Sequence, residues 1–191
     1  SLIGDTVSGY RIERRLGRGA MGTVYLAHQL SVDRPVALKI LAPRLAGDVA
    51  FVQSFLEEAR AAGRLNHQNV VQVYDAGRGG DSIYISMEYL EGGSVEELLV
   101  KEGRLQPGVA VPMAMDAAEA LAFAERHRIV HRDIKPANLL LDAEGVVKIG
   151  DPCTVETSTP RRKLVSGERS AYSISTSNSC PASTAPTGSP R

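Results

Sequence analysis

The amino-acid sequence predicts an α+β fold, with most strands in the first 90 residues and most helices after them. Short runs rich in β-branched and aromatic residues recur in the first part, and such runs favour strands. Longer segments carry apolar residues three and four positions apart, as amphipathic helices do. At 191 residues with 43% hydrophobic content, the chain fits one domain with a buried core, followed by a tail.

Each element can be placed from these patterns. Five strands are expected near Tyr10–Leu16, Thr23–His28, Pro35–Leu41, Val70–Ala76 and Ser82–Glu88. Helices are expected near Asp48–Leu65, Ser94–Lys101 and Pro107–Arg128, and two short strands at Leu139–Leu141 and Val146–Ile149 around a turn at Asp142–Gly145. The apolar face expected on the longest helix comprises Val111, Ala114, Met115, Ala118, Leu121 and Ala122.

A glycine-rich loop lies between the first two expected strands. Residues 17–22 read Gly-Arg-Gly-Ala-Met-Gly, and glycines let backbone N–H groups approach a phosphate closely. Alone this pattern is weak, because it also marks dinucleotide-binding folds, where a helix follows the glycines. Here a second strand follows, so the sequence predicts a strand–loop–strand lid.

The run His131-Arg132-Asp133-Ile134-Lys135-Pro136-Ala137-Asn138 carries the chemistry. Phosphoryl transfer needs a carboxylate to take a hydroxyl proton, a cation near the phosphate and an oxygen ligand for a metal. Asp133, Lys135 and Asn138 are residues of these three kinds in one loop. The octet resembles the catalytic loop of eukaryotic-type (Hanks-type) serine/threonine protein kinases. The glycine-rich loop, with its methionine, resembles the bacterial branch of that family.

Further motifs of the family follow the same order along the chain. Val36-Ala37-Leu38-Lys39 resembles the kinase third strand, with Lys39 seventeen residues after Gly22. Both Glu57 and Glu58 could be the partner of Lys39, and the family's spacing of nine residues before His67 favours Glu58. Asp151, eighteen residues after Asp133, fits the family's metal-binding aspartate. The implied fold is the kinase fold, with a five-stranded, one-helix small lobe and a partial helical lobe.

The resemblance also implies a role for each site residue. Asp133 would orient and deprotonate a serine or threonine hydroxyl, while Lys135 would steady the γ-phosphate. Lys39 and Glu58 would position the triphosphate of ATP, and Asn138 and Asp151 would hold Mg²⁺. Met87 would be the gatekeeper, and the backbone of Glu88 and Leu90 would face the adenine. The expected ATP-binding residues are Leu16, Gly17, Gly19, Gly22, Val24, Ala37, Lys39, Met87, Glu88, Leu90 and Leu140.

The family pattern stops at Asp151, which is followed by Pro152-Cys153 instead of Phe-Gly. Residues 152–191 contain nine Ser, six Thr and five Pro, so we expect a disordered tail. The sequence thus predicts a partial kinase domain over 1–151, with the small lobe over about 1–90 and the start of the large lobe over about 91–151. A reading-frame change near codon 151 is one hypothesis for this truncation. Truncation would expose apolar surface around Ile129, Ile134, Leu139 and Leu141.

Alternative functions remain open at this point. The chain could be a non-catalytic ATP-binding or interaction module, or a gene fragment that does not fold. The expected partners are ATP and protein substrates; the zero net charge gives no indication of nucleic-acid binding. The two cysteines and the absence of a signal peptide or membrane segment in this chain suggest a cytoplasmic location.

Overall fold

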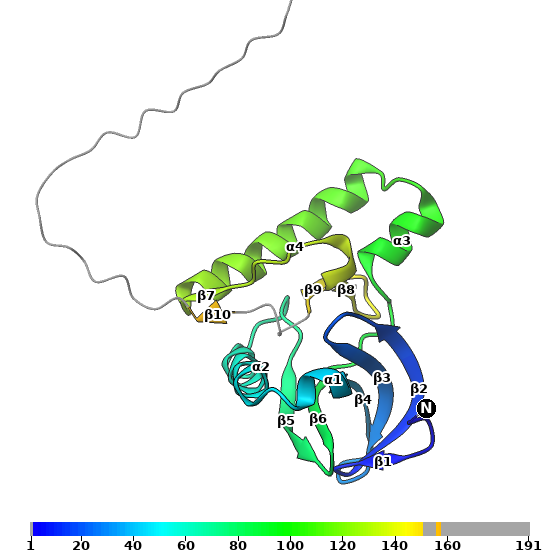
Figure 1. Cartoon of the computed structure of the whole chain (residues 1–191). Helices are drawn as coiled ribbons and strands as arrows, with labels where there is room; N and C mark the ends of the chain where they lie inside the picture. The colour runs from blue at the N-terminus through cyan, green and yellow to red at the C-terminus, as the bar shows by residue number, and fades with distance from the viewer. Residues whose placement is uncertain (1, 151–155, 158–191) are drawn as a thin grey trace, which may run out of the picture. The chain divides into compact units, whose positions relative to one another are not determined.

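We analysed a computed structural model of the chain, which describes residues 2–150, 156 and 157 (Figure 1). The described residues belong to one compact unit. The predictions for Asp151 and for the tail from Pro152 onward lie outside the described residues, apart from the two-residue strand β10 (Glu156–Thr157), which pairs with β7 (Ile129–Val130).

The first part of the unit is a six-stranded antiparallel sheet. Its strands, in the spatial order β1-β2-β3-β4-β6-β5, are β1 (Thr6–Val7), β2 (Tyr10–Arg18), β3 (Gly22–Gln29), β4 (Arg34–Leu41), β6 (Ser82–Met87) and β5 (Val73–Gly79). All five expected strands are present, and β1 adds a short sixth strand at the edge. The fourth expected strand begins three residues late, because Val70 and Val71 instead reach across to Ile149 of the second part.

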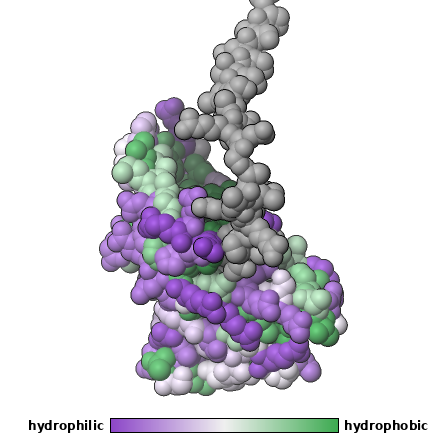
Figure 2. Space-filling view, turned by 90° about the vertical axis from the view of Figure 1, so that its left-hand side faces the viewer, coloured by the Kyte–Doolittle hydropathy of each residue, from purple (hydrophilic) through white to green (hydrophobic). Residues whose placement is uncertain are grey.

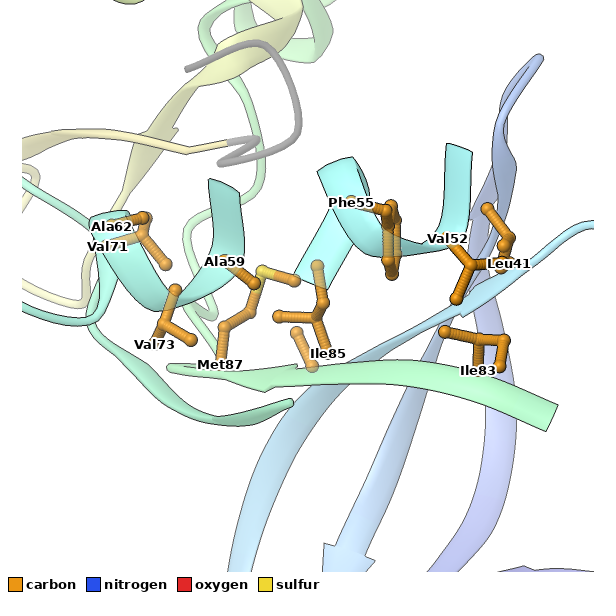
Figure 3. Close-up of a cluster of buried hydrophobic side chains, with 11 residues drawn as sticks. Leu41, Val52, Phe55, Ala59, Ala62, Val71, Val73, Ile83, Ile85 and Met87 are labelled. Atoms are coloured by element: carbon orange, nitrogen blue, oxygen red, sulfur yellow. The ribbon is translucent and has the colours of Figure 1, made fainter. Parts of the chain in front are cut away.

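The sheet buries apolar side chains on both of its faces, since neighbouring residues of a strand point to opposite sides. On β4, Val36, Leu38 and Ile40 pack on one face with Tyr10 and Ile12 of β2. The other face, with Leu41, Ile83 and Ile85, packs against helix α2 (Figure 3). The sheet is therefore covered on the side where the lysine of β4 also points.

Helix α2 (Val49–Ala62) begins where Asp48 accepts a hydrogen bond from the Phe51 N–H and ends at Gly63. Its buried residues recur at helical spacing and point toward β6 (Figure 3); they are Val52, Phe55, Ala59 and Ala62. A four-residue helix, α1 (Pro43–Ala46), precedes it. The predicted end at Leu65 was three residues too long, because the N–H groups of Arg64 and Leu65 donate to carbonyls three residues back, which tightens the last turn.

The second part begins after a linker, residues 88–94, which joins β6 to α3. It contains α3 (Val95–Glu102), α4 (Pro107–Arg126), β7, a 3₁₀ turn (Pro136–Asn138) and the hairpin β8 (Leu139–Leu141) and β9 (Val147–Ile149). A capping box between Ser94 and Glu97 starts α3. The side chain of Asp142 accepts hydrogen bonds from the N–H groups of Glu144 and Val146. These bonds stabilise the turn predicted at Asp142–Gly145.

This second part has small apolar cores of its own. Ile129 and Leu141 are both 6% exposed, so the expectation that these residues would lie on exposed apolar surface was wrong for them. Leu141 packs with Val95 and Val147, and Ile129 packs with Ala124. Ile134 is 42% exposed, as expected. Of the four residues expected on exposed apolar surface, two are thus buried, Leu139 is half-buried and Ile134 is exposed.

The buried side of α4 differs from the prediction: of the six residues expected on the apolar face, only Leu121 packs against the core. Its buried residues are Ala117, Ala120 and Ala124, whereas Val111 is 56% and Met115 58% exposed. The sequence pattern favoured the larger side chains, but Ala117 and Ala120 pack with Ile149 of β9, and Ala124 packs with Ile129 of β7. The face of the molecule drawn in Figure 2 is mainly hydrophilic, with hydrophobic residues in separate patches. Within the part of the chain described, no helix has the length and apolar character needed to span a membrane.

Candidate active site

A cleft of about 450 Å³ lies between the sheet, the linker and the β8–β9 hairpin. This volume falls within the range of sites that bind small molecules, roughly 300–1,000 Å³. Residues from segments far apart in the sequence line it, from Arg14 on β2 to Gly150 after β9. Among the lining residues are ten of the predicted site residues: Leu16, Gly17, Val24, Ala37, Lys39, Met87, Glu88, Leu90, Asn138 and Leu140.

Apolar side chains from three strands line two opposite walls of this cleft. Val24 on β3 and Ala37 on β4 belong to the sheet, while Leu140 on β8 belongs to the second part. Val24 and Leu140 are both only partly buried and pack at the margin of the core beneath α2. A flat, apolar ring could be held between such walls, since each wall offers aliphatic contact. Met87, at the end of β6, is 6% exposed and pairs with Ala37, so it closes the inner end.

Lys39 lines the cleft from the middle of β4 and is 8% exposed. It pairs with Val24 on one side and Ile85 on the other, so its backbone is fixed by two neighbouring strands. Its neighbours Leu38 and Ile40 point to the opposite face of the sheet. The strand therefore holds this amine on the cleft side, where an anionic ligand could compensate its charge.

Glu58 lies on α2, on a half-buried position between the buried Phe55 and Ala59, whereas Glu57 is exposed. Its Oε1 accepts a hydrogen bond from Ser54 Oγ at 2.9 Å within the same helix. Of the two candidates, Glu58 is thus the one beside the packed face of the helix. Its pairing with Lys39 stays a prediction.

The glycine-rich loop shows two different uses of glycine. Gly17 lines the cleft, and the N–H of Gly19 donates a hydrogen bond to the Gly22 carbonyl at 2.8 Å, which closes the hairpin tip. A Cβ atom on Gly22 would lie 2.1 Å from the Ile40 carbonyl oxygen of β4. Gly22 is therefore required by close strand packing at this position. Gly19 and Gly22 are not among the residues that line the cleft in this conformation.

The catalytic-loop residues converge on the carboxylate of Asp133. The Nζ atom of Lys135 donates to Asp133 Oδ2 at 2.6 Å, and Asn138 Nδ2 donates to the same oxygen at 3.0 Å. Asn138 Nδ2 also donates to the Asp133 carbonyl oxygen at 2.8 Å, and Asn138 is 8% exposed. These contacts fix the loop and lower the pKa of Asp133, chiefly through the hydrogen bond from Lys135 and further through Asn138.

The loop is fixed to the hairpin that lies beneath it. His131 Nε2 lies 2.8 Å from the Gly150 carbonyl oxygen, and the Gly150 N–H donates to the Asn138 carbonyl at 2.9 Å. His131 is 7% exposed, which fits a structural residue. The hairpin is in turn tied to the first part, since the Ile149 N–H donates to the Asn69 carbonyl and the Val71 N–H to the Ile149 carbonyl. The loop and the sheet thus share one support.

Several lining residues were not predicted from the sequence. Arg14 lies two positions before Leu16 on β2, and its Nη2 donates to the hydroxyl of Tyr89 in the linker at 2.9 Å. The pairing of β2 with β3 shifts register between Arg15 and Gly17, so simple alternation along the strand did not indicate Arg14. The other unpredicted lining residues are Tyr89, Glu91, Gly93, Ser94, Glu97, Ala137 and Gly150.

A small lobe with a covered sheet, a linker, a cleft and an Asp-x-Lys-x-x-Asn loop below it define the class of protein kinases. The comparisons agree: the model of the protein kinase domain family matches residues 10–169. The chain belongs to this family, and the curated proteins that it resembles are serine/threonine-protein kinases of bacteria.

Two curated relatives show the extent of the match. The serine/threonine-protein kinase PrkC of Bacillus subtilis is 44% identical over 151 residues, which is 78% of this chain and 23% of PrkC. PknL of Mycobacterium tuberculosis is 41% identical over 144 residues, 75% of this chain and 36% of PknL. The chain therefore spans between about a quarter and a third of the length of these relatives.

A solved structure shows the same fold. The kinase domain of Mycobacterium tuberculosis PknI, a C20A mutant, is 32% identical and superposes with a TM-score of 0.69. The match covers 80% of this chain and 62% of that kinase domain. The predicted kinase-like α+β fold is confirmed for the matched part.

Proposed function

We propose that this chain binds ATP and transfers its γ-phosphoryl group to serine or threonine hydroxyls of proteins. The observation that carries the proposal is the convergence of the cleft residues. Lys39 lies on the wall formed by the sheet, and Asn138 lines the cleft from the last position of the catalytic loop. The cleft could thus hold a base among Ala37, Met87 and Leu140, with the phosphates toward Lys39 and Asn138.

The linker offers the polar groups that would recognise an adenine. Glu88 and Leu90 both line the cleft. The N–H of Glu88 already donates to the Gln72 carbonyl at 2.8 Å, which leaves the Glu88 carbonyl as the group to accept a bond from the exocyclic amine. We assign the complementary donor to the N–H of Leu90.

Asp133 would orient the hydroxyl of the protein substrate and accept its proton. Because hydrogen bonds from Lys135 and Asn138 lower its pKa, Asp133 is ionised at neutral pH and can act as an acceptor. Lys135 lies beside it, with its side chain 52% exposed, and could approach the γ-phosphate while it stabilises the carboxylate. Placement and electrostatics of this kind account for most of the catalysis in phosphoryl transfer.

Asn138 fits the proposed role of a magnesium ligand. Its Nδ2 faces Asp133, so its Oδ1 lies on the opposite side of the same amide, and Mg²⁺ accepts amide oxygens as ligands. Asp151 would supply the second protein ligand and lies outside the described residues. Bound Mg²⁺ would neutralise charge on the phosphates during transfer. We place the reaction in the cytoplasm, where ATP is available.

The experiment is a transfer assay with labelled ATP, Mg²⁺ and a general serine/threonine substrate such as myelin basic protein. The wild-type chain should label the substrate or itself on serine or threonine. Asp133→Ala should abolish the label while retaining ATP binding, and Lys101→Ala on α3 should behave as wild type. Labelling that survives in Asp133→Ala would contradict the assignment.

A second candidate is a non-catalytic ATP-binding module. One observation favours it. All residues that line the described cleft lie between positions 14 and 150, so the cleft for ATP is formed by a chain that covers only 62% of the PknI kinase domain. ATP binding without phosphate transfer in the wild-type chain would select this candidate. A chain without cooperative thermal unfolding would exclude both and favour a fragment that does not fold.

A further inference from the structure

The side chain of Glu88 has a role distinct from that of its backbone. Its Oε1 pairs with the Nζ of Lys148 at 2.6 Å, and its Oε2 accepts a hydrogen bond from the Gln72 N–H at 3.2 Å. The two side chains of the ion pair are 23% and 17% exposed. Both carboxylate oxygens are thus engaged, and the linker is connected to the start of β5 and to β9 at once.

Lys148, the partner of Glu88, lies on β9, the strand that pairs with β8 beside the cleft. Lys148 is the central residue of β9 and pairs with Leu140, which lines the cleft. The next residue, Ile149, exchanges backbone hydrogen bonds with Asn69 and Val71 of the first part, and Gly150 then lines the cleft. A displacement of Lys148 would therefore also displace Leu140 and Gly150, which line the cleft.

We propose that Glu88 and Lys148 are positioning residues that fix the linker relative to β9. The linker is where the base would be recognised, and β9 leads to the end where the phosphates and the metal would be held. This inference rests on the proposed ATP site, which it extends from the residues that touch ATP to a pair that sets their spacing. Charged groups less than a quarter exposed are screened less than surface pairs, so the pair can hold this geometry.

The proposal predicts a ligand-specific effect. Adenosine would use the linker and the apolar walls alone, whereas Mg²⁺-ATP must fit the linker and the phosphate end simultaneously. Loss of the ion pair should weaken Mg²⁺-ATP binding about tenfold, the size expected for one charge-assisted hydrogen bond, and adenosine binding less than twofold. A purely structural role would lower the melting temperature without distinguishing the two ligands.

The test compares Glu88→Gln, Lys148→Met and the double variant in the full chain, at a temperature where all are folded. Affinities for Mg²⁺-ATP and adenosine are obtained by isothermal titration. If the residues act as a pair, the double variant should lose no more than either single variant. Glu102→Gln is the matched control, because Glu102 forms an exposed pair with Lys101 at 3.6 Å on α3.

Three results would overturn the proposal: unchanged Mg²⁺-ATP affinity in both single variants, equal losses for adenosine and Mg²⁺-ATP, or additive losses in the double variant. A wild-type chain that is folded but binds neither ligand would instead overturn the proposed ATP site, and with it this inference. The wild-type titration therefore separates failure of the site from failure of the pair.

Discussion

The Nζ atom of Lys135 lies 2.6 Å from Oδ2 of Asp133, and Asn138 donates to the same oxygen at 3.0 Å. Two donors on one carboxylate oxygen favour its ionised form, and they lower the pKa of Asp133. The catalytic loop therefore carries a carboxylate that stays charged to a lower pH than an isolated aspartate.

We expect Lys135→Met to raise the pKa of Asp133 toward its ordinary value, because the strongest donor is lost. Carbon-detected NMR titration of the Asp133 carboxyl measures this directly. A group with a lowered folded pKa stabilises the fold above its unfolded pKa, and this contribution disappears as the pH falls through the folded pKa. The acid limb of any transfer activity should move to higher pH in Lys135→Met; an unchanged Asp133 titration would contradict the assignment.

We expect Gly92→Ala to destabilise the linker. A Cβ atom there would lie 2.7 Å from the Leu141 and Asp142 carbonyl oxygens, and the Gly92 N–H also donates to Leu141. Overpacking of this kind costs about 1–3 kcal/mol, measurable as a loss in the free energy of unfolding by urea. Gly108→Ala on α4 is the control, since nothing lies within 4 Å of its Cβ position. Equal stability of the two variants would show that the linker can move away from β8.

We expect Asp116→Ala to weaken the junction between α4 and the hairpin. Asp116 Oδ2 accepts a hydrogen bond at 3.0 Å from the N–H of Val147, which is fully buried. An unsatisfied buried N–H costs about 1–3 kcal/mol, so urea unfolding should show a loss of that size. Asp116→Asn keeps an acceptor and should lose less, while Glu119→Ala, exposed on the same helix, should be near neutral. A stable Asp116→Ala variant would mean that this bond contributes little.

We expect the two sides of α4 to respond differently to charge. Met115→Lys, at a position 58% exposed, should change the free energy of unfolding by less than about 0.5 kcal/mol. Ala117→Lys, two residues later and 7% exposed, should prevent cooperative unfolding or lower the melting temperature strongly, because it buries a charge. Circular dichroism melts of the two variants give the comparison. A larger loss of stability in Met115→Lys than in Ala117→Lys would instead support the buried face predicted from the sequence.

The sequence predicted the strands well because β-branched runs and motif spacing are local signals. It misplaced the buried side of α4 for all predicted residues except Leu121, because the small alanines at 117, 120 and 124 form the buried side, which hydrophobicity alone does not indicate. The cleft residues Lys39, Met87 and Leu140 could be predicted, because each belongs to a motif. The Glu88–Lys148 pair could not be predicted, since it joins residues 60 positions apart without a shared motif.

The most direct test of the cleft as an ATP site is the Mg²⁺-ATP-dependent rise in melting temperature. A ligand that binds only the folded state raises the free energy of unfolding. Well above the Kd, this increase grows with the logarithm of the ligand concentration. We predict a saturable, concentration-dependent rise for the wild-type chain, lost in Lys39→Ala and retained in Lys101→Ala. A wild-type melting temperature that does not respond to Mg²⁺-ATP, or an equal response in Lys39→Ala, would contradict the account.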